Sequence, residues 1–331
     1  MADFLATILA HQQSAQPDAP EAAAASALAE CVRGCAEHAW LPCAGVGMTA
    51  QSARLRLGDL LGRAGLDRMR ALPHDLPAAA ETASDPMAIV FAQFLADPSL
   101  GAVLLHARRP VKVNAGHEVP IDVFLLVGSM VRLQRQTSGA GTTPQTEPSS
   151  DWRKLIGAGL ENVAPIGRLC RPVAVSLQCD EYGSPVTESA SAARRLDSTQ
   201  TAAAFVQGWT HLTQAMGDVA LWRARKPFWV VDRRVNEDSV ALQGVTMALA
   251  HPDARDYFLP GSDLMRGDEA LHLADELEDA SGASALLAWT LACMQLARQA
   301  TSKQDAAVVL GLKNPKRIDL GVVTRTANPL G

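Results

Sequence analysis

Apolar residues recur at helical spacing through most of the first hundred positions of the chain. They return at steps of three and four in the stretches 22–39, 49–72 and 84–96. This period places apolar side chains on one face of a helix, so each stretch predicts an amphipathic helix. The apolar start, Ala2 to Gln12, predicts a further short helix. We therefore expect residues 1–100 to form a mainly helical region.

The pattern changes to short β-prone runs after Gly101. Residues 102–107 and 110–113 are dominated by apolar side chains, and Val119 to Gln134 is a longer run rich in valine and leucine. Runs of this kind, bounded by turn-forming residues, are typical of strands. We therefore expect a β-rich segment over residues 101–135.

The stretch 136–150 reads QTSGAGTTPQTEPSS and holds no apolar residue larger than alanine. Such a segment buries too little apolar surface to offset the entropy lost when its backbone is ordered. It is therefore predicted to be a flexible loop or linker. The sequence leaves open whether this stretch separates two domains.

Residues 151–331 mix strand and helix patterns without a strict alternation, which argues against a doubly wound parallel sheet. The sequence shows no internal repeat of useful length. We predict an α+β fold, in which a helical N-terminal region precedes a mixed or antiparallel sheet with packed helices, and residues 151–331 share that sheet. The elements predicted in this region are strands at 172–179, 228–235 and 240–248, and helices at 199–216, 267–279 and 283–300.

The composition is that of a globular protein with a sizeable core, because 48% of the 331 residues are hydrophobic and 20% are charged. The start lacks the basic leader of an export signal, and the chain lacks an apolar run of about 18 residues, so neither secretion nor a membrane span is predicted. Six cysteines are too few for a disulfide scaffold. We therefore expect a cytoplasmic protein with free thiols and no contact with membranes.

One candidate site lies in the predicted helix 22–39 and just beyond it. Cys31, Cys35, His38 and Cys43 have the spacing C-x3-C-x2-H-x4-C, and zinc takes four ligands of these types in a tetrahedron. The alternative is that they are small side chains buried on the packed face of the helix, as free cysteine commonly is. That alternative needs no metal, and we expect no cofactor.

A second candidate is the basic aromatic block at residues 221–234, which reads LWRARKPFWVVDRR. Aromatic rings can stack on unpaired bases while cations contact phosphates, so the block predicts a nucleic-acid surface. The alternative is a surface strand pair with its cations in water and its aromatic residues in the core. Because the net charge is −5, any contact with nucleic acid must use such a local patch. The candidate residues are Trp222, Arg223, Arg225, Lys226, Trp229, Arg233 and Arg234.

Residues 303–320 partly resemble the helix-turn-helix pattern of DNA-binding proteins. Ala307 stands at the small position of the first helix and Gly311 at the turn, with Leu310 and Leu312 at the flanking apolar positions. The resemblance implies two short helices and contact with DNA. A single helix that ends at Gly311 is the alternative explanation.

Familiar catalytic motifs are absent from the chain. It has no phosphate-binding loop, no dinucleotide-binding glycine motif, no serine nucleophile elbow and no HExxH zinc motif. We therefore expect a non-enzymatic cytoplasmic subunit of a larger assembly, which binds other protein subunits and contacts nucleic acid through the basic aromatic block. The alternative is a metalloprotein or an enzyme of unfamiliar type that uses Cys31, Cys35, His38 and Cys43.

Overall fold

The computed structural model of the chain divides into two compact units. The N-terminal unit comprises Leu5–Arg168 together with Ser281–Thr290 and Asn328–Gly331. The C-terminal unit comprises Leu169–Ala280 and Leu291–Ala327 together with Met1–Phe4. The structure describes residues 4–13, 19–32, 40–45, 50–66, 70–73, 85–96, 102–113, 117–129, 167–179, 194–215, 226–233, 239–251, 259–273, 283–298 and 305–325.

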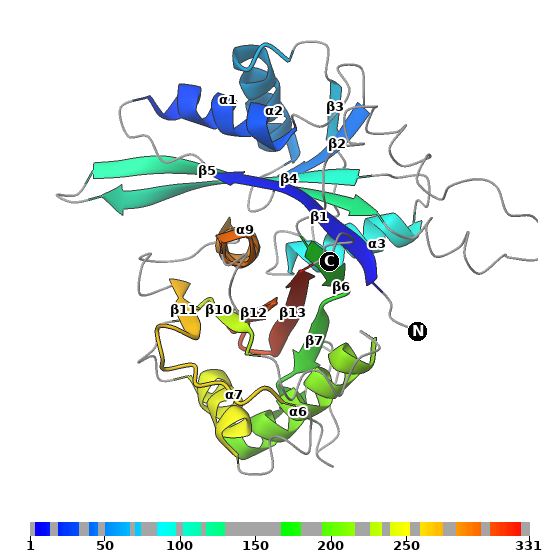
Figure 1. Ribbon diagram of the computed structural model, residues 1–331, viewed down its shortest axis with the longest axis vertical. Coiled ribbons are helices and arrows are strands. Elements are labelled where there is room, and N and C mark those ends of the chain that lie inside the picture. The colour runs from blue at the N-terminus through cyan, green and yellow to red at the C-terminus, as the bar shows by residue number, and fades with distance from the viewer. Residues whose placement is uncertain are drawn as a thin grey trace, which may run out of the picture. The chain divides into compact units, whose positions relative to one another are not determined.

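The first eight elements along the described chain alternate between strand and helix and end in a hairpin: β1 (Phe4–Gln13), α1 (Pro20–Cys31), β2 (Trp40–Gly45), α2 (Ala50–Arg63), β3 (Arg70–Pro73), α3 (Pro86–Ala96), β4 (Ala102–Val113) and β5 (His117–Ser129). Their strands lie in the order β3-β2-β4-β5-β1. β2 is parallel to β3 and to β4, whereas β5 is antiparallel to β4 and to β1. α1 and α2 lie together over one face of this sheet (Figure 1).

The carboxyl ends of β2 and β3 lie beside the middle of β4. Gly45, the last residue of β2, pairs with His106 of β4, and Pro73, the last residue of β3, pairs with Cys43. Beyond this point β4 and β5 continue as a two-stranded hairpin, whose last pair joins Val113 and His117. His106 is thus placed at the carboxyl edge of the parallel strands.

The elements that follow along the described chain are β6 (Gly167–Cys170), β7 (Val173–Ser176), β8 (Gln178–Cys179), β9 (Arg194–Arg195), α6 (Ser198–Ala215), β10 (Phe228–Val231), α7 (Val240–Ala250), β11 (Ala270–His272), α9 (Ala283–Arg298), β12 (Ala306–Gly311) and β13 (Arg317–Arg325). In the C-terminal unit the strand order is β11-β10-β12-β13, and β7 also pairs with β13. β10 is parallel to β11 and to β12, whereas β13 is antiparallel to β12 and to β7.

Two sets of five strands repeat one topology: β1, β2, β3, β4 and β5, and β7, β10, β11, β12 and β13. In each set, the second strand is parallel to the third and the fourth, and the fifth is antiparallel to the fourth and the first. Helices α1, α2 and α3 join the strands of the first copy, and α6, α7 and α9 stand at the same places in the chain order of the second copy. The chain therefore contains an internal repeat of topology, which the sequence did not reveal because different residues build the two cores.

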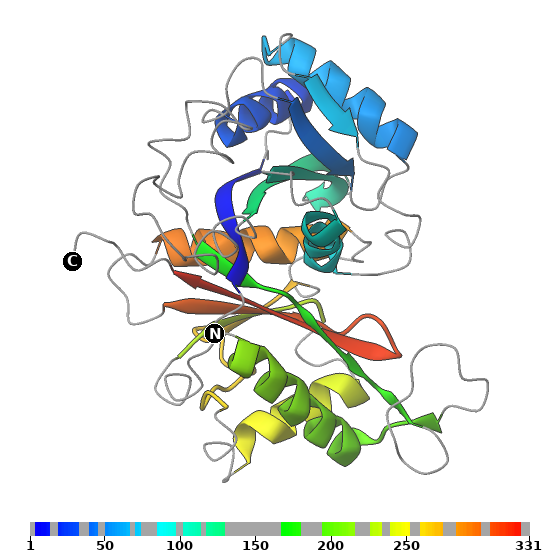
Figure 2. The same cartoon turned by 90° about the vertical axis from the view of Figure 1, so that its right-hand side faces the viewer.

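The core of the C-terminal unit lies between its sheet and the paired helices α6 and α7, which run side by side in Figure 2. Trp209 of α6 stacks on Trp229 of β10 with ring centroids 5.9 Å apart, and both side chains are fully buried. α7 approaches α6 closely at Gly244, where an added Cβ would lie 2.6 Å from the side chain of Thr201. Apolar side chains thus fill this layer.

The predicted fold class is confirmed, because helices accompany a sheet with both parallel and antiparallel pairs. The stretches 22–39, 49–72 and 84–96 overlap α1, α2 and α3, but the strand β2 was missed and β3 begins within the predicted helix 49–72. Residues 4–12 of the predicted helix 2–12 instead belong to β1, because this strand pairs with β5. The expected linker at 136–150 lies outside the described residues.

Three further predictions in the C-terminal unit are wrong. Residues 270–272 of the expected helix 267–279 form the strand β11, because they pair with β10. The expected strand 240–248 is the helix α7, whose first turn is capped by the Ser239 hydroxyl, which accepts a hydrogen bond from Leu242 N. Residues 303–320, which partly resemble a helix-turn-helix, contain the antiparallel strands β12 and β13. Their continuous burial on the sheet outweighs the local helix pattern. None of the described helices is long and apolar enough to span a membrane.

Candidate functional site

A cluster of polar side chains lies at the carboxyl edge of the parallel strands in the C-terminal unit. We call Asp232, Arg233, His272 and Lys313 the edge cluster. Asp232 and Arg233 follow β10, His272 ends β11, and Lys313 comes two residues after the end of β12. Because these strands are parallel, their carboxyl ends meet at one edge, which is where α/β sheets usually bind ligands.

Asp232 and Arg233 together hold the turn that follows β12. The two carboxylate oxygens of Asp232 accept hydrogen bonds from Leu312 N at 2.7 Å and Lys313 N at 3.2 Å. The Arg233 guanidinium donates to the Leu312 carbonyl oxygen at 3.1 Å and 3.2 Å, and to the Lys313 carbonyl oxygen at 3.4 Å. Two neighbouring side chains thus bind both backbone amides and both carbonyls of the turn.

His272 lies between two segments at the same edge. One ring nitrogen is 2.8 Å from the carbonyl oxygen of Leu264 and the other is 3.1 Å from the carbonyl oxygen of Arg233. The side chain is buried, so these contacts fix the ring against the end of β10. The edge cluster is therefore a rigid set of groups rather than a scatter of surface charges.

The carboxyl group of Asp232 has an unusual electrostatic setting. Burial raises its pKa above the ordinary value, although the hydrogen bond from Leu312 N and the charge of Lys313 act in the opposite direction. The carboxylate forms no ion pair within 4 Å among the residues that the structure describes. A buried acid of this kind can hold and release a proton closer to neutral pH than an exposed aspartate can.

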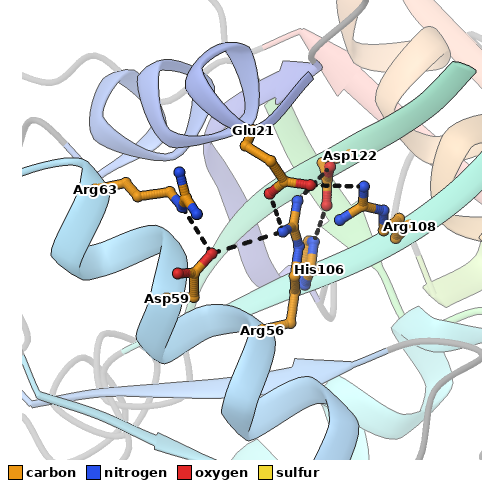
Figure 3. A network of polar contacts seen from close by, with 7 residues as sticks. All are labelled: Glu21, Arg56, Asp59, Arg63, His106, Arg108 and Asp122. Carbon is orange, nitrogen blue, oxygen red and sulfur yellow. Dashed lines mark hydrogen bonds and ion pairs between the residues drawn. The ribbon is translucent and has the colours of Figure 1, made fainter. Parts of the chain in front are cut away.

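A second polar cluster, the buried network shown in Figure 3, lies in the N-terminal unit. Asp122 of β5 sits at its centre, 2.8 Å from His106 Nε2 and 3.0 Å from the Arg56 guanidinium. Glu21 of α1 pairs with Arg56 and, at 2.9 Å, with Arg108. His106 also stacks on Phe124 at a centroid distance of 4.7 Å. The network thus ties α1 and α2 to the β4–β5 hairpin.

The buried network keeps its carboxylates ionised. Burial tends to raise the pKa of Asp122, but the hydrogen bonds and charges of His106 and Arg56 outweigh it and hold that pKa below its usual range. For Glu21, the hydrogen bond from Arg56 is the main cause of a lowered pKa. Asp122 and His106 have no exposed surface, so a substrate cannot reach them. We therefore assign this network to holding α1 and α2 on the hairpin, and take the edge cluster as the candidate functional site.

Asp85 is a third buried carboxylate, at the start of α3. It accepts hydrogen bonds from Met87 N at 2.8 Å and from the Trp289 indole nitrogen at 2.9 Å. The first contact satisfies an amide that has no partner within the helix, as a helix cap does. The second ties α3 to the first half of α9. Both contacts are structural.

The structure leaves the predicted metal site untested. Cys31 is buried on α1, whereas Cys35 and His38 lie outside the described residues, and of Cys43 only the backbone in β2 is described. Across the described ranges, no group of three or more histidine, cysteine or acidic residues is placed to hold a metal ion. Burial raises the pKa of the Cys293 thiol to about 12, so that group stays protonated at neutral pH.

Of the seven residues of the predicted nucleic-acid surface, the structure describes Lys226, Trp229 and Arg233. Trp229 is fully buried against Trp209, so its ring cannot stack on a base. Arg233 binds the backbone of the turn after β12, and Lys226 is exposed. Trp222, Arg223, Arg225 and Arg234 lie outside the described residues. The alternative prediction for the block, with its aromatic residues in the core, holds for Phe228 and Trp229.

Sequence reasoning missed the edge cluster. Asp232 is the single acid of the basic aromatic block, and no motif marks His272. The available signal was a polar pair directly after the apolar run FWVV, at the point where a buried strand ends. Only the parallel pairing of β10 with β11 and β12 shows that this point is a carboxyl edge.

Solved structures provide the comparison for this chain, because no protein-family model matches the sequence and no curated protein is similar to it. The acetyl-CoA acetyltransferase from Syntrophomonas wolfei matches with a TM-score of 0.51 and 8% identity, over 97% of this chain and 99% of that one. Human mitochondrial 3-ketoacyl-CoA thiolase has a TM-score of 0.47 at 9% identity, over 98% and 100% of the two chains. An oxazolomycin ketosynthase domain from Streptomyces albus has a TM-score of 0.48 at 9% identity, over 97% and 95%. The fold assignment rests on the acetyltransferase.

This similarity overturns the expected function. A non-enzymatic subunit with a nucleic-acid surface was inferred from missing motifs and from the basic aromatic block. The chain instead has, over nearly all of its length, the fold of an acetyl-CoA acetyltransferase. Trp229 of the block is in the core. The missing motifs misled because at 8% identity a shared fold leaves no local pattern to read.

Proposed function

We propose that this protein is an acyl-thioester enzyme, which transfers an acyl group from a thioester such as an acyl-CoA to an acceptor. The observation that carries this proposal is the end-to-end similarity to an acetyl-CoA acetyltransferase. Coverage of 97% of this chain leaves neither unit outside the similarity. A shared fold alone does not fix a reaction, so the proposal depends on the test below.

The edge cluster is the part of the described structure that we assign to this chemistry. Acyl transfer from a thioester needs a group that can hand a proton to the departing sulfur or take one from the acceptor. A buried carboxyl with a raised pKa suits that task, and Asp232 is such a group. Arg233 and His272 hold the backbone around it in place.

Among the described cysteines, Cys293 is a poor candidate for carrying a thiol-bound acyl intermediate. A thiol attacks a thioester only as its thiolate. Cys31, Cys170, Cys179 and Cys293 are all buried, and burial raises the pKa of Cys293 to about 12. The Cys293 thiol is therefore not suited to take up the acyl group.

We also propose that the protein works in the cytoplasm. The four described cysteines are free rather than paired in disulfides. Free buried thiols are typical of a reducing compartment, where disulfides rarely persist.

The proposed function is tested with the full-length protein and a panel of thioesters, including acetyl-CoA and octanoyl-CoA. We expect one of them to raise the melting temperature and to release free CoA when a thiol acceptor such as N-acetylcysteamine is present. Chromatography with mass detection identifies the acylated acceptor. A protein whose melting temperature is unchanged by every thioester, and which releases no CoA, does not have this function.

A further inference from the structure

We propose that Asp232 is the catalytic acid of this enzyme, the group that gives a proton to the departing thiolate of the thioester. The inference rests on the proposed acyl-thioester function and specifies which proton transfer Asp232 performs.

The position of Asp232 is the first argument. It directly follows β10, the strand that lies between β11 and β12 and is parallel to both. Ligands of sheets with parallel strands bind at the carboxyl ends of those strands. Asp232 is therefore at the centre of the edge where a substrate would bind, with His272 at the end of the neighbouring strand.

The second argument is that the hydrogen bonds of Asp232 leave it free to carry a proton. Leu312 N and Lys313 N each donate to a different oxygen of the carboxylate. Each carboxylate oxygen has two lone pairs, so a site for a proton remains on both. Both donors belong to the backbone, which keeps the group in place without neutralising it as a bound side-chain cation would.

The proton balance of the step is simple. The thioester carbonyl carbon bonds to the sulfur of a thiol acceptor while its bond to the CoA sulfur breaks, and that electron pair leaves with the CoA sulfur. The Asp232 carboxyl gives its proton to this thiolate. The acceptor attacks as its thiolate, having given its proton to water, and the Asp232 carboxylate recovers a proton from water. The products are the new thioester and free CoA, and Asp232 ends as it began.

Asp122, the buried aspartate of the N-terminal unit, shows what distinguishes Asp232. Asp122 is fully buried and pairs with Arg56 and His106, whereas Asp232 retains 9% of its surface and is bound by backbone amides. A carboxylate held by two side-chain partners stays ionised. The two aspartates are therefore suited to different tasks, one to stabilise the unit and the other to exchange a proton.

The experiment compares wild type with Asp232→Asn, using the thioester and the thiol acceptor that wild type turns over. Asparagine cannot donate a proton as an acid, so we expect kcat to fall about 10²–10⁴-fold, the usual contribution of general acid–base catalysis. Wild-type activity should decline at alkaline pH as the acid loses its proton. The residual activity of the variant should lack this alkaline limb.

Asp319→Asn is the matched control. Asp319 lies on β13, in the hairpin whose turn Asp232 binds, and is opposite Gly311 of β12. Its carboxylate pairs with Arg317 at 2.9 Å. This variant should keep both the wild-type rate and the alkaline limb. Wild-type kcat and pH profile in Asp232→Asn would overturn the assignment of Asp232 while leaving the proposed function in place. A wild-type protein that neither binds nor consumes any thioester would overturn both.

Asp232→Glu keeps the assignment testable if Asp232→Asn fails to fold. Glutamate retains an acidic group but moves it by one methylene, so its rate should be reduced and its alkaline limb should move to a different pH. If the activity of Asp232→Glu declined at the same alkaline pH as that of wild type, another group would supply the proton.

Discussion

The outer layers of the two units use the same topology and fill it with different chemistry. In the C-terminal unit, α6 and α7 cover the sheet with an apolar core centred on the stacked Trp209 and Trp229. In the N-terminal unit, α1 and α2 cover the corresponding strands, but part of the layer is the buried network around Asp122. One arrangement of strands thus accepts either a wholly apolar core or a partly charged one.

The comparison teaches that these cores are stabilised in different ways. The apolar layer gains free energy from the area that it removes from water. A buried ion pair gains less, because desolvation of the charges offsets most of their attraction, yet loss of one partner is costly. The network therefore holds α1 and α2 in one particular position on the hairpin more than it adds net stability.

The largest expected effect is on the apolar layer. Trp229→Ala should lower the free energy of unfolding by about 3–5 kcal/mol, because it removes a fully buried ring and leaves a cavity against Trp209. Urea denaturation measures the change. Hydrogen exchange should show the loss of protection in peptides of the C-terminal unit. A loss under about 1 kcal/mol would mean that Trp229 is not in the core.

Loss of Asp122 comes next. Asp122→Ala should cost about 3–5 kcal/mol, towards the lower end because Arg56 retains some contact with solvent. The control is Arg63→Ala, which breaks the exposed pair with Asp59 and should cost at most about 0.5 kcal/mol. Equal losses in the two variants, measured by urea denaturation, would contradict the role given to the buried network.

A fall in pH should weaken the contribution of Asp122 and Glu21 to stability and strengthen that of Asp232. Asp122 and Glu21 have lowered pKa values in the folded state, so their contribution is present above the unfolded values of about 4 and is lost as pH falls below them. Asp232 has a raised pKa, so its contribution is present below about 4 and is lost as pH rises through the folded value.

This contrast is measured as the free energy of unfolding between acid and neutral pH. Asp122→Asn should reduce the loss of unfolding free energy that occurs as pH falls below about 4. Asp232→Asn should reduce the loss that occurs as pH rises above about 4. If both variants kept the wild-type pH dependence, neither aspartate would have the folded-state pKa described above.

The smallest effects concern helix glycines. Gly244→Ala should cost about 1–3 kcal/mol, because the new Cβ meets the side chain of Thr201 and the carbonyl of Ser198. Gly58→Ala in α2 is the matched control, since its new Cβ meets nothing within 4 Å. It should stabilise the protein by up to about 1 kcal/mol through helix propensity alone. Thermal melts of the two variants that shifted in the same direction would show that Gly244 is not at a close contact.

The sequence by itself determined those features that depend on neighbouring residues. Helical spacing of apolar residues predicted the segments that overlap α1, α2 and α3, and the apolar run around Trp229 predicted the strand β10. The mixture of both patterns predicted the α+β class. In α7 the apolar residues Ala241, Leu242, Val245 and Leu249 have helical spacing, although the β-prone composition of 240–248 favours a strand.

Tertiary structure decided everything that joins distant parts of the chain. Segment 4–13 is a strand because β5 offers it a partner, and no local pattern predicts that pairing. Arg108 reaches Glu21 across 87 positions, and Asp232 reaches Leu312 across 80. The topological repeat is equally invisible in the sequence. A fold constrains which positions are buried, but it does not fix whether tryptophans or an ion-pair network fill them. The edge cluster exists for the same reason: parallel strand pairing brings residues 232, 272 and 313 to one edge, and no spacing along the chain encodes that meeting.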